Sequence, residues 1–194
     1  MPQTLCTSAF PAIHVRCCNI FEIFLHFLSK KLAKFGKTSY FCHMKKNIEK
    51  VREFAIGHAR TGKDSIHGID HWDRVARNGE ALHVPGADME VVLCFAYLHD
   101  VERQSDAYDV EHGPKAAELI DQIRESVLGF LDDKQIGLLK DACTFHTTVP
   151  RTGNPTIDAC FDADRLDLPR AYIIPDPDKM ATKEGAEKAR QMKS

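Results

Sequence analysis

The chain has 194 residues, of which 43% are hydrophobic and 28% are charged, and its formal net charge at pH 7 is −2. This length suits one domain with a sizeable core, and the composition is that of a soluble globular protein. The near-neutral charge gives no general case for nucleic-acid binding, so we expect no nucleic-acid partner.

The beginning of the chain differs from the rest in charge. Residues 1–50 hold eight Lys and Arg against two acidic residues, a balance of +6. A basic arm of this kind could touch a membrane or nucleic acid, but we favour an unstructured extension. The apolar stretch over 17–28 contains Glu22 and His26 and is shorter than the roughly 20 residues of a membrane span. We therefore predict no transmembrane helix, no secretory signal and no membrane partner.

A cleaner helical pattern begins at Met44. We therefore predict that residues 44–194 form the domain. Residues 1–43 are interpreted as an N-terminal extension that is either disordered or a start-site artefact.

From residue 44 onward, apolar residues recur at helical spacing and no alternating strand pattern or internal repeat is found in the sequence. Asp64 or Ser65 is the expected N-cap of a helix over 66–82, Asp88 that of a helix over 89–99, and Asp132 or Asp133 that of a later helix. Helices are predicted over residues 66–82, 89–99 and 156–168. Two more are expected to begin near Pro114 and after Asp132 or Asp133, and a last helix ends the chain. The predicted fold class is all-α, with a single helical domain.

The chain has seven cysteines and no CxxC pair, which excludes a zinc ribbon and a thioredoxin-type motif. Cys94, Cys143 and Cys160 lie in apolar helical stretches and are expected to be small buried hydrophobes in a reducing compartment. We accordingly expect a cytoplasmic protein.

Polar side chains recur where a helical core should be apolar. His99 and Asp100 end the apolar run over 91–98, and His71 shares one helical face with Val75 and Leu82. His71 alone would be interpreted as a hydrogen-bonded core histidine. A zincin protease is not favoured, because Gly68 stands where the glutamate of that motif belongs.

Asp164 falls on the apolar stripe of Ile157 and Phe161, where an unpaired carboxylate would be costly. His146 continues the helical spacing of Cys143, and His112 precedes a helix start. Taken together, inward-facing imidazoles and carboxylates on separate helices favour a first-row divalent metal. We interpret Asp162 and Asp167 as solvated charges or salt-bridge partners.

The ordered set of His71, His99-Asp100 and Asp164 resembles the H…HD…D pattern of the HD superfamily of metal-dependent phosphohydrolases. The segment over 71–75 is similar to the family's H-x-x-R-V opening, and the segment over 163–167 to its A-D-x-L-[DE] close. The resemblance covers roughly residues 50–180 and implies an HD-type helical domain.

Two further segments resemble those of two-metal HD proteins, especially the bacterial hydrolases of symmetrical dinucleoside tetraphosphates. They are His112-Gly113 and His146-Thr147-Thr148. Arg103 stands where these relatives often carry a lysine, and it keeps the positive charge. The G-Y-P signature of cyclic-dinucleotide phosphodiesterases and the E-D pair of guanosine-tetraphosphate hydrolases are missing from the sequence.

The resemblance implies a metal-dependent phosphohydrolase that cleaves a phosphate ester or anhydride, of a nucleotide in the favoured interpretation, by attack of a metal-bound hydroxide. It implies one or two divalent metals (Mn, Fe, Ni, Co or Mg) and a small phosphorylated substrate as the partner; the oligomeric state stays open. The implied metal ligands are His71, His99, Asp100, His112, His146 and Asp164. The implied catalytic residues are Asp100 and Arg103, and the substrate-binding candidates are His67, Arg74, Lys115 and Arg165. Two alternatives remain: a non-catalytic HD module that binds metal or nucleotide for regulation, and an HD-type di-iron oxygenase.

Overall fold

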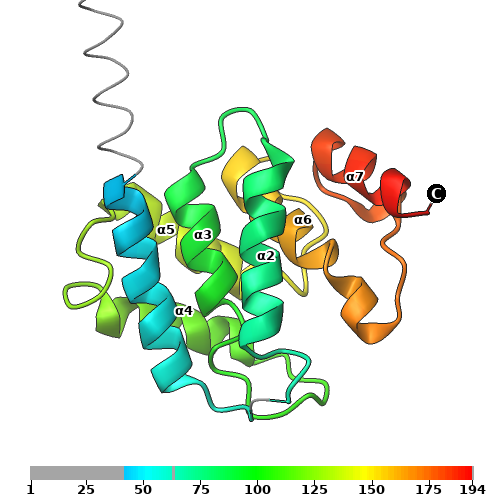
Figure 1. Cartoon of the computed structure of the whole chain (residues 1–194). Helices are drawn as coiled ribbons and strands as arrows, with labels where there is room; N and C mark the ends of the chain where they lie inside the picture. The colour runs from blue at the N-terminus through cyan, green and yellow to red at the C-terminus, as the bar shows by residue number, and fades with distance from the viewer. Residues whose placement is uncertain (1–41, 63, 194) are drawn as a thin grey trace, which may run out of the picture. The chain divides into compact units, whose positions relative to one another are not determined.

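The computed structural model describes residues 42–62 and 64–193 (Figure 1). All regular structure in this part is helical, which confirms the all-α prediction. Residues from Met44 to the C-terminus group into one compact unit by their contacts. The predictions made for residues 1–41 lie outside the described part. No helix among the described residues is long and apolar enough to cross a membrane.

The described chain is helical over residues 42–58 and then forms six further α-helices and two 3-10 turns. The α-helices are α2 (Ile69–Leu82), α3 (Met89–Leu98), α4 (His112–Ile123), α5 (Asp133–Phe145), α6 (Pro155–Arg165) and α7 (Lys183–Lys193). The 3-10 turns are η1 (Leu168–Ala171) and η2 (Pro177–Lys179).

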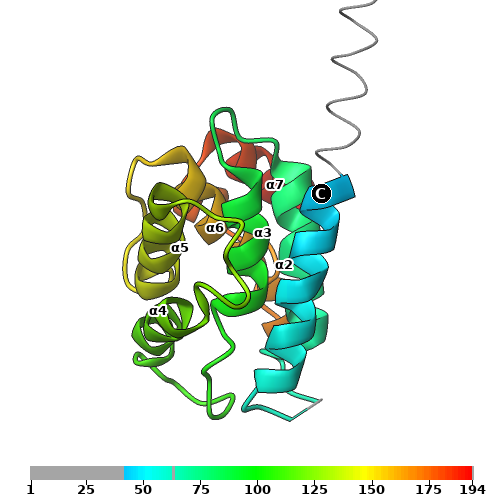
Figure 2. The ribbon, with the colours of Figure 1, turned by 90° about the vertical axis from the view of Figure 1, so that its left-hand side faces the viewer.

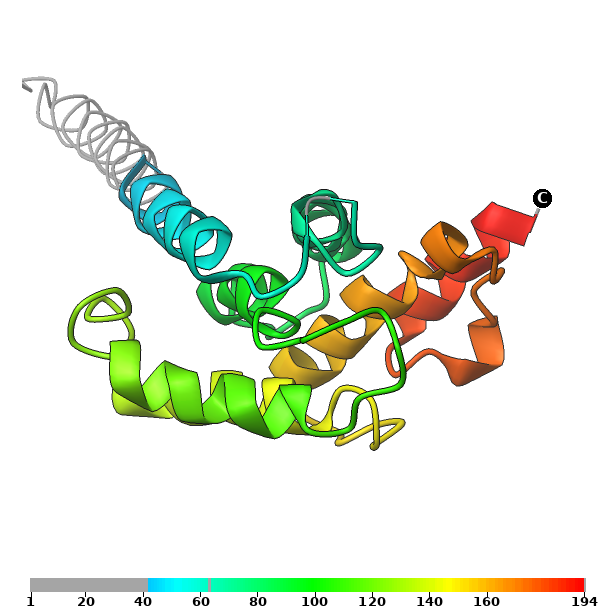
Figure 3. The ribbon, with the colours of Figure 1, turned by 90° about the horizontal axis from the view of Figure 1, so that it is seen from below.

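Helix α3 is the centre of the bundle. All its residues from Val91 to Leu98 are buried, as expected for a helix that is apolar on every side. It packs against α2, α5 and α6, and Figures 1 and 2 show it surrounded by these helices. Helix α4 runs alongside α5, as the view from below in Figure 3 shows. The residues that follow α3 directly, His99 and Asp100, are therefore delivered into the interior.

Side-chain caps fix several helix starts. Asp88 accepts hydrogen bonds from the backbone N–H groups of Glu90 and Val91, and Asp132 forms a capping box with Gln135. Both caps confirm the sequence prediction, Asp132 being the residue used of the two offered. The prediction for α2 was wrong: its N-cap is Gly68, which has no side chain to form a cap, so neither Asp64 nor Ser65 serves.

The helix predicted over 156–168 is shorter than expected. It ends at Arg165, and the chain then turns through η1, with Pro169 near the start of this short segment. Asp167 lies in the turn between α6 and η1, where its carboxylate meets the side chain of His71 on α2. The end of α6 is thus set by a turn that also supplies a functional contact.

Candidate metal centre

Six side chains from five helices converge in the interior of the bundle. They are His71 of α2, His99 and Asp100 at the end of α3, His112 at the start of α4, His146 at the end of α5, and Asp164 of α6. All but Asp164 are buried, and His99 and His112 are 0% exposed. The structure therefore brings together all six residues that the sequence predicted as metal ligands.

The first group lies around the Nε2 atom of His71. This atom is 3.1 Å from Nε2 of His99, 3.5 Å from Oδ2 of Asp100 and 3.4 Å from Oδ1 of Asp164. Nε2 of His99 is in turn 3.5 Å from Asp100 Oδ2 and 3.9 Å from Asp164 Oδ1. Two imidazoles and two carboxylates thus point at a common volume.

The second group lies on the other oxygen of Asp100. Nε2 of His112 is 3.1 Å from Asp100 Oδ1, and Nε2 of His146 is 3.8 Å from the same oxygen. The two Nε2 atoms are 3.0 Å apart. The Asp100 carboxylate therefore lies between the two groups, with one oxygen facing each.

The close approach of His112 and His146 depends on the glycine that follows His112. A Cβ on Gly113 would collide with the backbone carbonyl of Cys143 on α5. Only a residue without a side chain lets α4 and α5 come this near. This contact gives a physical reason for the His112-Gly113 pair noted in the sequence.

The hydrogen bonds of the Nδ1 atoms fix the tautomers. Nδ1 of His99 lies 3.1 Å from the Phe95 carbonyl, that of His112 lies 2.6 Å from the Asp109 carbonyl, and that of His146 lies 2.7 Å from the Cys143 carbonyl. A carbonyl can only accept, so each Nδ1 donates and each neutral ring presents a lone pair at Nε2. Metal-binding histidines are held in this way by an acceptor on their other nitrogen.

His71 is oriented by a carboxylate. Its Nδ1 donates to Oδ2 of Asp167 over 2.7 Å. Burial opposes the charged imidazole of His71, but hydrogen bonds with Asp100 and Asp167 outweigh it and raise the pKa above its ordinary value. Burial lowers the pKa of His99 to about 3, so this ring stays neutral at physiological pH. A cation between the two rings needs the neutral form of His71, so cation binding would compete with protonation of this ring.

The first group fits a divalent cation. Ligands 2.0–2.1 Å from one ion lie about 2.8–3.4 Å apart in octahedral or tetrahedral geometry, close to most separations in this group. Oδ1 of Asp164 is buried and has no hydrogen-bond partner among the described residues. A buried carboxylate oxygen without a hydrogen bond is costly unless cations compensate it, and the Arg170 guanidinium 3.6 Å away supplies part of that compensation.

Three groups of three residues around this centre have ligand atoms close enough together to hold one ion each. The ligand atoms within each group lie within 4.8 Å of one another. The groups are His67, His71 and Asp100; His71, His99 and Asp164; and His99, Asp100 and His146. The mixture of imidazole and carboxylate ligands is the one preferred by first-row divalent metals.

His67 and Arg103 both contact Asp100. Nδ1 of His67 lies 2.8 Å from Asp100 Oδ2, although His67 precedes α2 and does not sit one helical turn before His71 as the sequence suggested. Nε of Arg103 donates to Asp100 Oδ1 over 3.0 Å, and a second nitrogen donates to the Ala107 carbonyl. These contacts place a polar ring and a guanidinium directly beside the carboxylate that joins the two groups.

Sequence reasoning missed the supporting roles of Asp167 and Arg170. Asp167 is buried and accepts from Nε of Arg74 over 2.6 Å as well as from His71. Arg170 lies 3.6 Å from Asp164 Oδ1 and 3.9 Å from Asp167 Oδ2, and it donates to the Ile66 carbonyl. Asp167 is a salt-bridge partner, as one of the two interpretations held, but it also orients a ligand.

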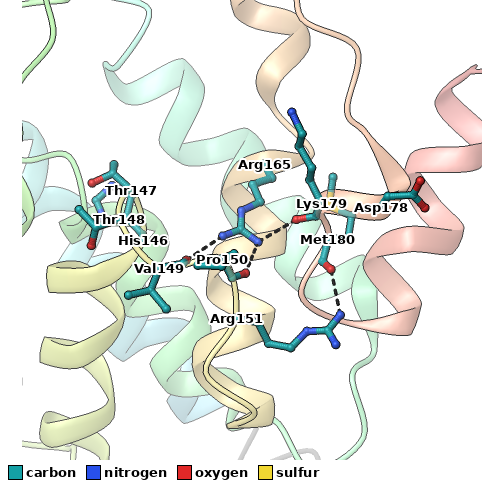
Figure 4. A pocket seen from close by; sticks show the side chains of 10 residues that line it. All are labelled: His146, Thr147, Thr148, Val149, Pro150, Arg151, Arg165, Asp178, Lys179 and Met180. Atoms are coloured by element: carbon teal, nitrogen blue, oxygen red, sulfur yellow. Dashed lines mark hydrogen bonds between the residues drawn. The ribbon is translucent and has the colours of Figure 1, made fainter.

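The remaining substrate-binding candidates lie in different surroundings. Arg74 is occupied by Asp167, which links it to His71. Lys115 is exposed on α4, three residues after His112. Arg165 turns to the loop after α5 and donates to the carbonyls of Val149 and Pro150, as Figure 4 shows. Arg74 and Arg165 are thus engaged with groups outside the six converging side chains.

Comparisons with known proteins agree with the geometry of this site. No family model matches the chain, and no curated protein matches it. A crystal structure of a predicted HD superfamily hydrolase from an uncultured Thermotogales bacterium is similar to it, with a TM-score of 0.58 and 25% sequence identity. The match covers 78% of this chain and 85% of that chain. The likeness to hydrolases of dinucleoside tetraphosphates stays a prediction. The shared helical bundle, together with the His and Asp groups at its centre, supports the assignment of this chain to the HD-domain superfamily.

Proposed function

We propose that this protein is a metal-dependent hydrolase of a phosphate ester or anhydride, with a nucleotide as the substrate. The observation that carries the proposal is the position of Asp100, whose two carboxylate oxygens face two separate sets of imidazole lone pairs. A single carboxylate can hold two cations about 3.5–4 Å apart, the spacing used in two-metal hydrolysis. The name of the similar Thermotogales protein, a predicted hydrolase, agrees with this chemistry.

The ligands divide between two positions. His71, His99, Asp100 and Asp164 would hold one ion, and Asp100, His112 and His146 the other. Divalent ions bound here would lower the pKa of a coordinated water and stabilise negative charge on the phosphate oxygens. The chain supplies the orientation, because every Nδ1 atom of the four histidines is held by a carbonyl or by Asp167.

Cationic side chains beside the ligands would receive the substrate phosphate. Arg103 is 8% exposed and is held against Asp100 by its Nε, which leaves part of its guanidinium for phosphate oxygens. Arg170 brings a second guanidinium to Asp164. Fixed positive charges of this kind stabilise the charge that develops on phosphate oxygens during hydrolysis.

His67 would act on the same carboxylate from another side. Its Nδ1 contacts Oδ2 of Asp100, and its side chain is 13% exposed. The ring could hold Asp100 in position or pass a proton between Asp100 and a bound substrate. Solvent access distinguishes it from His71 and His99, whose side chains are fully buried.

A nucleotide panel tests the proposal. The purified protein is assayed with manganese, iron, nickel, cobalt and magnesium in turn, and its bound metal is measured. We expect phosphate release by the wild type and a loss of about a thousandfold or more in Asp100→Ala, together with the loss of bound metal. Asp141→Ala, an exposed aspartate on α5, is the matched control and should retain both.

Each alternative function predicts a different result with the same purified protein. Full activity in a metal-free Asp100→Ala protein would refute the proposed mechanism. Oxygen uptake with iron, in place of phosphate release, would identify an oxygenase. Metal and nucleotide binding without turnover of any compound would identify a regulatory module.

A further inference from the structure

A polar pocket lies against the outer side of the candidate metal centre. It has a volume of about 610 Å³ and is lined by residues 146–151 after α5, residues 178–180 around η2, and Arg165 of α6. Figure 4 shows these segments facing one another across the pocket. We call it the basic pocket. His146 belongs to its wall and also to the group around Asp100, so the pocket and the metal centre are neighbours.

Hydrogen bonds from α6 hold the basic pocket in shape. The guanidinium of Arg165 donates to the carbonyls of Val149 and Pro150 on one wall and of Lys179 on the other. Arg151 donates to the Met180 carbonyl and so joins the two walls a second time. Because the same helix carries Asp164, the pocket is fixed relative to the metal centre.

The loop wall is fastened at its far end as well. Asp158 of α6 accepts from the backbone N–H and the hydroxyl of Thr152 and from the backbone N–H of Gly153. The loop is therefore anchored to α6 at both of its ends. A pocket built in this way loses little conformational freedom when a ligand enters it.

The charges of the basic pocket favour an anion. Arg151, Arg165 and Lys179 contribute three positive charges, against one negative charge from Asp178. Figure 4 shows the Asp178 carboxylate turned away from the guanidinium of Arg165. The ammonium of Lys179 is exposed and has no hydrogen bond or ion pair with any residue that the structure describes. The exposed hydroxyl of Thr147 adds an uncharged donor to the same wall.

We infer that the basic pocket binds a second phosphate group of the substrate whose reacting phosphate lies at the metal centre. This inference rests on the proposed function and narrows its substrate class to molecules with at least two phosphates. Lysine and arginine side chains are the usual partners of phosphate, and the flexible stem of Lys179 lets its ammonium adjust its position to a bound phosphate. Because His146 borders both the pocket and the metal centre, one substrate can span the two sites.

Kinetics with matched substrates test the inference. The protein with its metals is assayed with a nucleoside monophosphate and with the triphosphate of the same nucleoside. Lys179→Gln should raise KM for the triphosphate about tenfold, because one charged contact is lost, while kcat and the KM for the monophosphate stay within about twofold. Lys134→Gln, which removes an exposed lysine on α5, should change neither substrate. Equal effects on both substrates, or none, would overturn the inference.

A binding experiment separates this inference from the proposed function. Methylenediphosphonate, whose P–C–P bridge resists hydrolysis, is titrated calorimetrically into the full chain with its metals. Lys179→Gln should weaken its binding about tenfold, and Lys134→Gln should not, whether or not the wild type hydrolyses any nucleotide. Unchanged binding in Lys179→Gln would overturn the inference. It would also be overturned if inorganic phosphate alone bound at Lys179 while the KM for the triphosphate stayed unchanged, since the pocket would then hold a separate anion.

Discussion

Two aspartates on α6, Asp162 and Asp164, stand two residues apart and have opposite surroundings. The carboxylate of Asp162 is completely buried and accepts from the backbone N–H groups of Ala181 and Thr182 and from the Thr182 hydroxyl, over 2.6–2.7 Å. Asp164, also largely buried, has one oxygen with no hydrogen-bond donor and faces the Nε2 atoms of two histidines. The protein thus supplies hydrogen bonds to both oxygens of Asp162, whereas Oδ1 of Asp164 has an ion pair with Arg170 but no hydrogen bond.

The difference separates a structural role from a ligand role. Buried polar groups in folded proteins are nearly always hydrogen-bonded, so an exception needs an explanation. Asp162 fastens the segment before α7, and Gly185 leaves the room for its carboxylate. Asp164 has an ion pair with Arg170 over 3.6 Å, but its buried Oδ1 receives no hydrogen bond, which leaves it available to a cation. A buried carboxylate oxygen that receives no hydrogen bond from the protein is therefore our criterion for a metal ligand. Three substitutions test this criterion.

The largest effect is expected at the satisfied carboxylate. Asp162→Ala leaves the backbone N–H groups of Ala181 and Thr182 without acceptors and should lower the free energy of unfolding by about 3 kcal/mol. Urea unfolding measures this value. Asp162→Asn keeps one acceptor oxygen and should cost less.

Bound metal is the control for Asp162→Ala. At temperatures where the variant is folded, its metal content should equal that of the wild type, because Asp162 does not face the histidines. A variant of normal stability that had lost its metal would contradict the structural role assigned here.

A smaller effect is expected from Asp167, which holds a ligand without being one. In Asp167→Asn the contact with Nδ1 of His71 loses its charge, and metal affinity should fall about ten- to a hundredfold. Competition with a chelator measures this change. Arg74→Gln keeps the bond between Asp167 and His71 while removing the ion pair, so its affinity should fall by less than about threefold. Equal losses in the two variants would mean that the ion pair, and not the orientation of His71, matters.

Local patterns were enough to predict the ligands that lie on regular helices. His71 and Asp164 occupy positions whose helical neighbours are apolar, and both face inward as the spacing predicts. The cap at Asp88 was likewise predictable from the sequence, because a cap depends on the two or three residues that follow it. Cys94, Cys143 and Cys160 are buried free thiols, as their apolar settings indicated.

Long-range contacts were not predictable in the same way. Asp167 meets His71 across 96 residues, and only the turn after α6 brings the two together. Asp162 was interpreted as a solvated charge or a salt-bridge partner; the solvated interpretation was wrong, because the segment over 181–185 folds back over that face of α6. Helical spacing tells which side of a helix a residue occupies, but not which distant segment covers that side.

The smallest effect is expected at Asp164, where the comparison of the two aspartates of α6 is tested most directly. In Asp164→Asn the carboxylate loses its charge and its ion pair with Arg170, and the new amide can donate to a lone pair of His71 or His99. The metal-free variant should therefore stay within about 1 kcal/mol of the metal-free wild type, because relief from burying a charge offsets the lost ion pair. With metal added, the wild type should become clearly the more stable of the two, because it gains the free energy of a fully liganded ion and the variant does not. Thermal unfolding with and without a chelator measures both differences. If Asp164→Asn destabilised the metal-free protein as Asp162→Ala does, Asp164 would be a structural carboxylate, and the criterion drawn from the missing hydrogen bond would fail.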